Sequence, residues 1–268
     1  DLSYNIRYLF LCAMKISLLQ NNITWAAPVN NHKHIEQLLS KADVADLYVL
    51  PEMFSTGFCT KPENIAEPLP CKTVEWMCTT AKEKGCALAG SVAVFDGTNY
   101  FNRFYFITPN GIEAYYDKKH LFTYGGEHLH FTPGKNRVIV NYKGVRILLQ
   151  TCYDLRFPVW SRNRGDYDMI IYVASWPTPR VNAWSALLRA RAIENQCYVA
   201  GVNRVGTDPS CEYCGGTALI DPYGNTMAEC KRNMEDNISG EIELSMLEQF
   251  RKTFPVQNDA DPFEIKQN

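Results

Sequence analysis

The chain has 268 residues, of which 46% are hydrophobic and 21% are charged, and its formal net charge is −2 at pH 7. This is the composition of an ordinary globular protein that is long enough to bury a sizeable core. The small net charge provides no long-range attraction to nucleic acid or to an anionic membrane, so we expect neither as a partner.

Ten cysteines are spread along the chain. Several lie inside apolar runs, as Cys197 does in QCYVAGVN, where a free cysteine behaves as a small hydrophobic residue. A chain of this length does not depend on a disulfide framework for its stability. We therefore interpret most of these cysteines as reduced thiols of a cytoplasmic protein.

The first segment with the pattern of a strand begins at Met14 and reads MKISLLQ. The apolar run that precedes it, residues 8–14, is too short for a membrane span, which needs about 20 residues. It also lacks the basic region and the small-residue cleavage site of a signal peptide. We therefore predict that residues 1–13 are a non-native or upstream extension and that residues 14–268 form a single domain.

Along the rest of the chain, short apolar runs alternate with amphipathic stretches of helical period. The predicted strands cover residues 15–20, 47–50, 87–95, 102–107, 112–116, 138–140, 145–150, 169–173, 197–202, 216–220 and 238–242. The predicted helices cover residues 31–41, 73–84, 158–164 and 181–195. Runs such as VRILLQTC and DMIIYVAS are typical of strands buried on both faces, and closely spaced strands indicate hairpins. The pattern predicts one α/β domain with mixed sheets inside and helices outside.

The C-terminal segment loses this regular pattern from about Arg251. It reads RKTFPVQNDADPFEIKQN, which has neither a helical nor a strand period. We predict an extended C-terminal arm that packs Phe254 and Phe263 on a surface, of this subunit or of a partner subunit.

Three segments combine a strand end with a reactive side chain. In LYVLPEMFSTGF a buried strand stops at Pro51, and Glu52 follows at once. In YYDKKHLFTYGGEH, Lys118 lies just beyond a strand, and Glu127 follows two glycines. In VRILLQTCYDLRFP a buried strand runs into Cys152. Catalytic groups often lie at the carboxyl ends of such strands, although each segment alone is more often an exposed carboxylate, a solvated lysine or a core cysteine.

The combination of the three segments has a chemical meaning that each one alone lacks. A cysteine nucleophile must be a thiolate or lie beside a base that takes its proton. It also needs positive charge or N–H donors for the oxyanion that forms on the substrate. A glutamate, a lysine and a cysteine at three strand ends supply these groups, so the sequence indicates a cysteine-dependent hydrolase.

Together the three segments resemble the motifs of the nitrilase superfamily, the carbon–nitrogen hydrolases with a Glu–Lys–Cys triad, from about residue 14 to residue 263. LPEMFSTGF is similar to the glutamate motif, which implies that Glu52 is the general base. YDKKHLF has the family's lysine two residues before the His-Leu-Phe run, which implies Lys118 rather than Lys119. TCYDLRFP implies that Cys152 is the nucleophile. The family fold is a four-layer α-β-β-α sandwich that usually forms a homodimer, so we expect this fold and a homodimer or higher homo-oligomer here.

Several strings resemble one branch of this superfamily, the omega-amidases: KHLF followed by GGEH, then CYDLRFP, ASWP and FPVQNDADPF. In that branch Glu127 would be a second active-site glutamate that positions the substrate and supports the triad. Arg156 would bind the substrate carboxylate, because its planar fork matches a carboxylate. Trp176 would line the pocket, and the backbone N–H of Tyr153 would join Lys118 in binding the oxyanion. The alternatives are a structural ion pair for Arg156 and simple core packing for Trp176.

The resemblance implies an omega-amidase that hydrolyses the terminal amide of small keto-dicarboxylic acid monoamides, such as α-ketoglutaramate, through a cysteine thioester. It implies no cofactor and no metal, and the pair His128-x-His130 has no further ligands at zinc-site spacing. The same triad would serve another amidase, an N-carbamoylase or a nitrilase. A different class also stays open, a thiol redox or metal-binding protein that uses Cys211 and Cys214.

Overall fold

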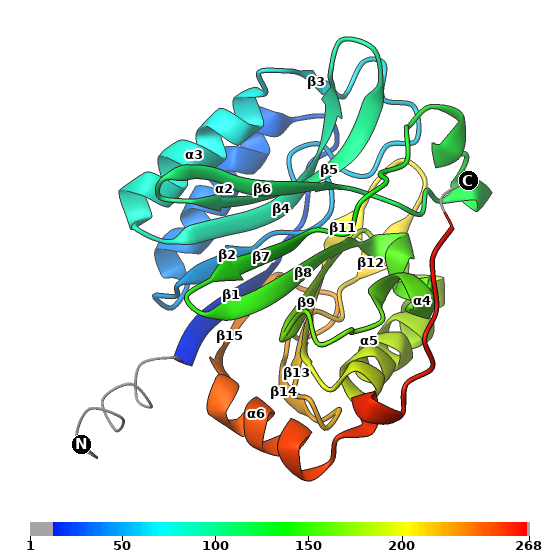
Figure 1. Ribbon diagram of the computed structural model, residues 1–268. Helices are drawn as coiled ribbons and strands as arrows, with labels where there is room; N and C mark the ends of the chain where they lie inside the picture. Colours follow the sequence, from blue (N-terminus) through cyan, green and yellow to red (C-terminus); the bar gives the residue numbers. More distant parts are fainter. Residues whose placement is uncertain (1–12, 267–268) are drawn as a thin grey trace.

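The computed structural model describes residues 13–266, which form two β-sheets packed face to face with helices outside them (Figure 1). The mixed α/β architecture predicted from the alternating pattern is confirmed. The predicted extension at residues 1–13 lies outside the described residues except for Ala13, which is the first residue of the first strand. The extension stays a prediction.

The first sheet has the strand order β15-β1-β2-β4-β5-β6, and the short strand β3 pairs with β4. Strands β1, β2 and β4 are parallel, whereas β15 pairs antiparallel with β1, and β4, β5 and β6 form two antiparallel hairpins. The bounds are β1 Ala13–Gln20, β2 Leu47–Val49, β3 Glu67–Pro68, β4 Ala87–Phe95, β5 Tyr100–Thr108, β6 Gly111–Asp117 and β15 Asp236–Glu243. The sheet is mixed, as the close strand spacing predicted.

The second sheet has the strand order β14-β13-β10-β9-β8-β7. Its central strands β8, β9 and β10 are parallel, and the outer strands pair antiparallel with them or with each other. A separate hairpin joins β11 and β12. The bounds are β7 Ile139–Tyr142, β8 Val145–Thr151, β9 Met169–Ala174, β10 Tyr198–Asn203, β11 Val205–Thr207, β12 Glu212–Cys214, β13 Ala218–Ile220 and β14 Thr226–Glu229.

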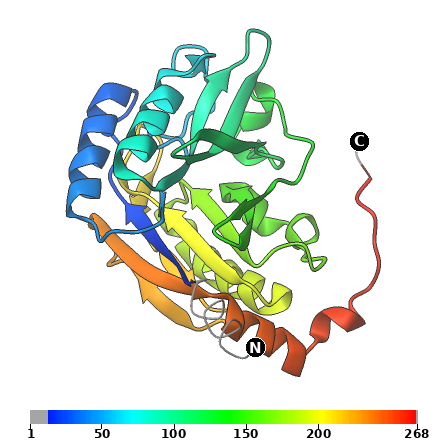
Figure 2. The same cartoon turned by 60° about the vertical axis from the view of Figure 1, so that its left-hand side comes forward.

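Helices cover the outer face of each sheet (Figures 1 and 2). The first sheet carries α2 (Pro28–Lys41) and α3 (Lys72–Lys84), and the second carries α5 (Val181–Asn195). The short helix α4 (Pro158–Ser161) ends three residues earlier than predicted. Within residues 13–266, none of the helices has the length and apolar character needed to span a membrane.

Strands β8 and β9 show why the central strands read as continuous apolar runs. Ile147 and Ile171 lie in the core between the two sheets, whereas Leu148 and Ile170 lie in the core between the second sheet and α5. Because both faces are covered, successive side chains are all removed from water, which stabilises the fold by about 1.5–3 kcal/mol for each large aliphatic residue. The layers are helix, sheet, sheet and helix, as the family resemblance implied.

The C-terminal region differs from the prediction. Helix α6 (Leu244–Thr253) was not predicted, because only Leu247 of its side chains is fully buried and the apolar stripe is narrow. Regular structure therefore continues past Arg251, and a helical turn at Val256–Asp259 follows before the irregular end of the arm. Both aromatic side chains of the arm contact this subunit: the Phe254 ring stacks on Phe250 of α6 with the ring centres 6.3 Å apart, and the Phe263 ring lies against Arg164.

Candidate active site

Glu52 lies just beyond the carboxyl end of β2. The N–H of Leu50 donates to the Ala89 carbonyl at 2.8 Å and extends the parallel pairing before the chain turns. The next residue after the glutamate, Met53, has a φ of 46°, in a region that costs a non-glycine residue about 1–3 kcal/mol. Its N–H donates to Ser91 Oγ at 2.9 Å, which holds the bend. The bend carries the Glu52 side chain into the interior.

Lys118 follows directly after β6, and its backbone is held on both sides. Its N–H donates to the Asn102 carbonyl at 3.0 Å, and its carbonyl accepts from the N–H of Gly134 at 2.9 Å. Only glycine fits there, because a Cβ on Gly134 would lie 1.9 Å from the carbonyl oxygen of Asp117. This close approach fixes where the lysine side chain enters the site.

Cys152 stands where β8 passes into a short 3-10 helix, Cys152–Arg156. Its φ is 45°, so the nucleophile sits on a strained turn comparable to the one that exposes the serine of many hydrolases. The N–H of Thr151 donates to Asp154 Oδ2 at 3.0 Å and fixes the turn. Tyr153 is the second residue of the helix, so its N–H is among those that have no acceptor within the helix.

Glu127 joins Glu52 and Lys118 in one buried network. Lys118 Nζ lies 2.9 Å from Glu52 Oε1 and 2.9 Å from Glu127 Oε2, and all three side chains are 0% exposed. The Asn102 amide donates to Glu52 Oε1 at 2.7 Å and to Glu127 Oε1 at 3.3 Å. The N–H of Phe122 donates to Glu127 Oε2 at 2.6 Å. The structure thus brings the predicted glutamates onto one ammonium group.

Burial and neighbouring charges set the protonation of these groups. Burial raises the pKa of the Cys152 thiol well above its ordinary value, and the Glu52 carboxylate adds to this effect, while Lys118 opposes it. Burial disfavours the charge of Lys118, but Glu127 and Glu52 outweigh it and raise the pKa of the lysine. Burial also raises the pKa of Glu127 by more than Lys118 lowers it. The resting site therefore holds a neutral thiol beside a charged lysine.

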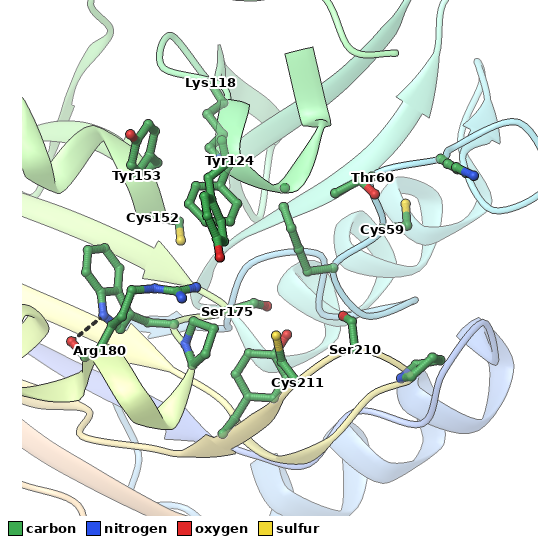
Figure 3. A pocket seen from close by; sticks show the side chains of 18 of the residues that line it. Cys59, Thr60, Lys118, Tyr124, Cys152, Tyr153, Ser175, Arg180, Ser210 and Cys211 are labelled. Atoms are coloured by element: carbon green, nitrogen blue, oxygen red, sulfur yellow. Dashed lines mark hydrogen bonds between the residues drawn. The ribbon is translucent and has the colours of Figure 1, made fainter. Parts of the chain in front are cut away.

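A cavity of about 470 Å³ opens onto Cys152 (Figure 3). Lys118 and Ser175 also reach its floor, and several aromatic rings form its walls. The cations Lys61, Arg156 and Arg180 line it, and none of its lining residues is acidic. A cavity of this kind, apolar with a few placed polar groups, suits a small anionic molecule.

The three residues assigned to substrate binding, Arg156, Tyr153 and Trp176, all line this cavity. Arg156 forms no ion pair with any residue in the range 13–266, and its guanidinium lies 5.0 Å from the centre of the Trp176 ring. The alternative role for Arg156, a structural ion pair, is therefore not found among these residues. Trp176 packs in the core against Trp184 and also donates from Nε1 to the Arg180 carbonyl at 2.7 Å. Trp176 is both a core residue and a cavity wall.

Sequence reasoning missed three polar residues of the site, namely Asn102, Ser175 and Asp154. The N–H of Ser175 donates to Glu52 Oε2 at 2.9 Å and orients the carboxylate from the second sheet. Asp154 lies within CYDLRFP and Ser175 within ASWP. The resemblance of these two strings to the family was therefore the only feature of the sequence that could have identified them. Asn102 lies inside a predicted strand, where nothing in the sequence shows which residues its amide will meet.

The two cysteines of the C-x-x-C string lie in different surroundings. Cys211 lines the cavity, whereas Cys214 is buried in the core beneath α5. The nine cysteines within residues 13–266 are all free thiols. The same residues contain no group of three or more His, Cys, Asp or Glu side chains placed to hold a metal ion. In the His-x-His pair, Nδ1 of His130 lies 2.6 Å from Oε1 of Glu63.

Comparisons with known proteins agree with this geometry. The carbon–nitrogen hydrolase family matches residues 15–252. The chain is 44% identical to Omega-amidase YafV of Escherichia coli (strain K12), over 94% of this chain and 98% of that protein. It is 36% identical to the 2-oxoglutaramate amidase of Bacillus subtilis (strain 168), over 91% and 96% of the two chains.

A solved structure has the same fold. XC1258 from Xanthomonas campestris, a CN-hydrolase superfamily protein with an arsenic adduct in its active site, superposes with a TM-score of 0.91 at 42% identity. The match covers 95% of this chain and 99% of that one. With the fold, the buried Glu–Lys–Cys arrangement and these matches in agreement, the chain belongs to the carbon–nitrogen hydrolases of the nitrilase superfamily.

Proposed function

We propose that this chain is an omega-amidase that hydrolyses the terminal amide of small keto-dicarboxylic acid monoamides, such as α-ketoglutaramate, to the acid and ammonia. The observation that carries the proposal is Cys152 beside the buried Glu52–Lys118–Glu127 network, at the floor of a cavity lined by cations. Relatives that are named for this activity at 36–44% identity support it.

The first half of the reaction forms a thioester. Glu52 takes the proton of the Cys152 thiol as the sulfur attacks the amide carbonyl carbon. The electron pair of the C=O bond moves to oxygen, where Lys118 and the N–H of Tyr153 stabilise the negative charge. When this intermediate collapses, the C–N bond breaks, and the leaving nitrogen takes the proton from Glu52 to depart as ammonia. One oxyanion donor is typically worth about 10²–10³ in rate.

The second half regenerates the enzyme. Glu52 takes a proton from water, and the resulting hydroxide adds to the thioester carbonyl, again with Lys118 beside the oxyanion. The C–S bond then breaks, the carboxylic acid leaves, and the sulfur recovers its proton from Glu52. General acid–base assistance of this kind contributes about 10²–10⁴ in rate. Asn102 and Ser175 keep both oxygens of Glu52 oriented in each half.

The far end of the substrate meets the cationic part of the cavity. Arg156 has no acidic partner within residues 13–266 and lies on the cavity wall, so its guanidinium is available to a substrate carboxylate. Lys118 is already shared by two carboxylates, so we assign it to the oxyanion and not to the substrate carboxylate. We therefore assign the amide end to Cys152 and Lys118, and the carboxylate end to Arg156.

The experiment that tests this function measures ammonia release from α-ketoglutaramate by the purified protein and by Cys152→Ala. Cys211→Ala is the matched control, because it removes a second thiol from the same cavity. We expect release by the wild type and by Cys211→Ala and none by Cys152→Ala. No release from α-ketoglutaramate, with release from another amide, a carbamoyl amino acid or a nitrile, would move the chain to another branch of the family. Loss of activity in Cys211→Ala alone would contradict the assigned nucleophile.

The proposal also includes a homodimer or higher homo-oligomer, which comes from the family resemblance, and a cytoplasmic location, which comes from the interpretation of the cysteines as reduced thiols. Light scattering after size-exclusion chromatography gives the mass of the assembly directly. A mass of twice the 30.6 kDa chain or a higher multiple is expected, and a mass of one chain would contradict the homo-oligomer.

A further inference from the structure

Arg180 lies on the cavity wall beside Phe122. It ends a 3-10 turn, Thr178–Arg180, directly before α5. Its backbone is fixed, because its N–H donates to the Pro177 carbonyl at 3.0 Å and its carbonyl accepts from the Trp176 indole at 2.7 Å. Figure 3 shows its side chain extending into the cavity toward Cys152.

The guanidinium of Arg180 is held by an aromatic ring and by no acidic group. It lies 5.3 Å from the centre of the Phe122 ring and forms no ion pair or side-chain hydrogen bond within residues 13–266. Arginines that serve the fold differ in this respect, as Arg103 does with Asp117 at 2.6 Å. A half-buried guanidinium whose donors face a cavity is suited to an anion that enters the cavity.

The charges around the cavity also favour an anionic ligand. Glu52 and Glu127 are fully buried beneath its floor and are neutralised in part by Lys118. Besides the exposed Lys61, Arg156 and Arg180 are left as cations on the wall, one over the Trp176 ring and the other over the Phe122 ring. A cation–π contact uses no acidic partner, so the N–H donors of each guanidinium are available to a carboxylate. Arg156 is exposed to solvent, whereas Arg180 is half-buried and better shielded from water.

We propose that Arg180 determines substrate specificity by binding the carboxylate of the substrate together with Arg156, a role that rests on the proposed omega-amidase function. The amide carbon then lies at Cys152 while the other end of the same small molecule meets two guanidinium groups. Arg180 acts on ground-state and transition-state binding alike, since the carboxylate takes no part in the chemistry. Its loss is therefore expected to raise KM more than it lowers kcat.

The test compares Arg180→Gln with wild type on α-ketoglutaramate and on its methyl ester, which lacks the negative charge. The variant is expected to lose about 10–100-fold in kcat/KM on the acid, mainly through KM, and less than about threefold on the ester. Arg180→Lys is expected to recover part of the loss. The Trp176 contact is to the backbone of residue 180, so it survives both substitutions. Arg189→Gln, which removes the same charge from the exposed side of α5, is expected to leave both substrates unchanged.

Equal losses on acid and ester, or no loss on either, would overturn the role of Arg180. A second measurement separates this from failure of the proposed function. N-iodoacetylglycine and its methyl ester alkylate thiols and differ only in the carboxylate, and mass spectrometry reports the modification of Cys152 itself. If Arg180 helps to select carboxylates, the acid modifies Cys152 of the wild type faster than the ester does, and Arg180→Gln reduces that preference; an unchanged preference in the variant contradicts the role of Arg180. If the protein hydrolyses no keto-acid amide but shows this preference, the omega-amidase assignment fails and the anion-binding role stands.

Discussion

His120 donates from its backbone N–H to Asp154 Oδ1 at 3.0 Å, and its Nδ1 lies 2.7 Å from the same oxygen. This contact joins the segment that carries Lys118 to the turn that carries Cys152. The other oxygen of Asp154 accepts from the Tyr116 hydroxyl at 2.8 Å and from the N–H of Thr151 at 3.0 Å. One buried carboxylate therefore sets the distance between the oxyanion donor on one sheet and the nucleophile on the other.

Asp154→Asn tests this connection. An amide supplies one acceptor oxygen in place of two, so at least one donor among its four partners is left facing an NH₂ group, at a cost of about 1–3 kcal/mol. We expect a lower melting temperature and a kcat reduced about tenfold or more, with KM changed less because the cavity wall is intact. Thermal unfolding by circular dichroism and steady-state kinetics measure the two effects. Wild-type kcat in a destabilised variant would show that Asp154 serves stability alone.

Glu52→Gln separates the proton-transfer role of the glutamate from its charge. Burial and then the Glu52 carboxylate raise the pKa of the Cys152 thiol, so removing the carboxylate lowers that pKa. The pH at which iodoacetamide alkylation of Cys152 is half-maximal is expected to fall in the variant. Amide hydrolysis is expected to drop about 10²–10⁴-fold at the same time, because the base is gone. An alkylation profile that moves to higher pH would contradict this electrostatic account.

Glu127→Gln changes the acid side of the activity profile. Burial raises the pKa of Glu127, so as the pH falls this carboxylate takes up its proton earlier than an ordinary glutamate, and Lys118 then loses one of its two partners. We expect wild-type kcat to decline on the acid side at a pH above the ordinary glutamate value of about 4.3. The variant should be slower at every pH and should lack that decline. An unchanged acid limb in Glu127→Gln would assign the decline to another group.

Asp168→Asn tests an ion cluster that lies away from the catalytic residues. Asp168 pairs with Arg146 at 2.7 Å and with Arg251 of α6 at 2.9 Å. Burial opposes its charge, but the hydrogen bonds and charges of Arg146, with Arg251, outweigh it, so the pKa of Asp168 is lowered. A lowered folded-state pKa means that this stabilisation is fully present above about pH 4 and is lost as the pH falls further.

The variant is therefore expected to lose about 3 kcal/mol in free energy of unfolding at pH 7 and progressively less below about pH 4. Urea unfolding at several pH values gives the comparison, and ammonia release at pH 7 under native conditions should stay near that of wild type. If the difference in free energy of unfolding between wild type and variant increases as the pH falls, the predicted role of Asp168 is wrong.

The central strands and the Glu–Lys–Cys motifs could be predicted from the sequence, because both depend on local patterns. Continuous apolar runs identify strands buried on two faces. Cys152 directly follows such a strand, β8, and Glu52 follows the buried strand β2 after two further residues. Lys118 directly follows β6, whose side chains are mostly exposed or partly exposed. The short strands β3, β11, β12 and β14 were missed, since two to four residues carry almost no periodic signal. Helix α6 was also missed, and only one of its side chains is fully buried. Their place depends on contacts with distant parts of the chain, such as the pair between Arg251 and Asp168.

The sequence by itself determined the family, the four-layer fold and the identity of the chemical groups at the strand ends. Only the tertiary structure decided what each group meets. Asn102 spans the two glutamates because β5 lies between their segments, and Arg180 reaches the cavity because the turn before α5 packs on Trp176. The physical reason is that hydrogen bonds and charge effects depend on distances of a few ångströms between residues far apart in the chain, and a local pattern carries no record of those distances.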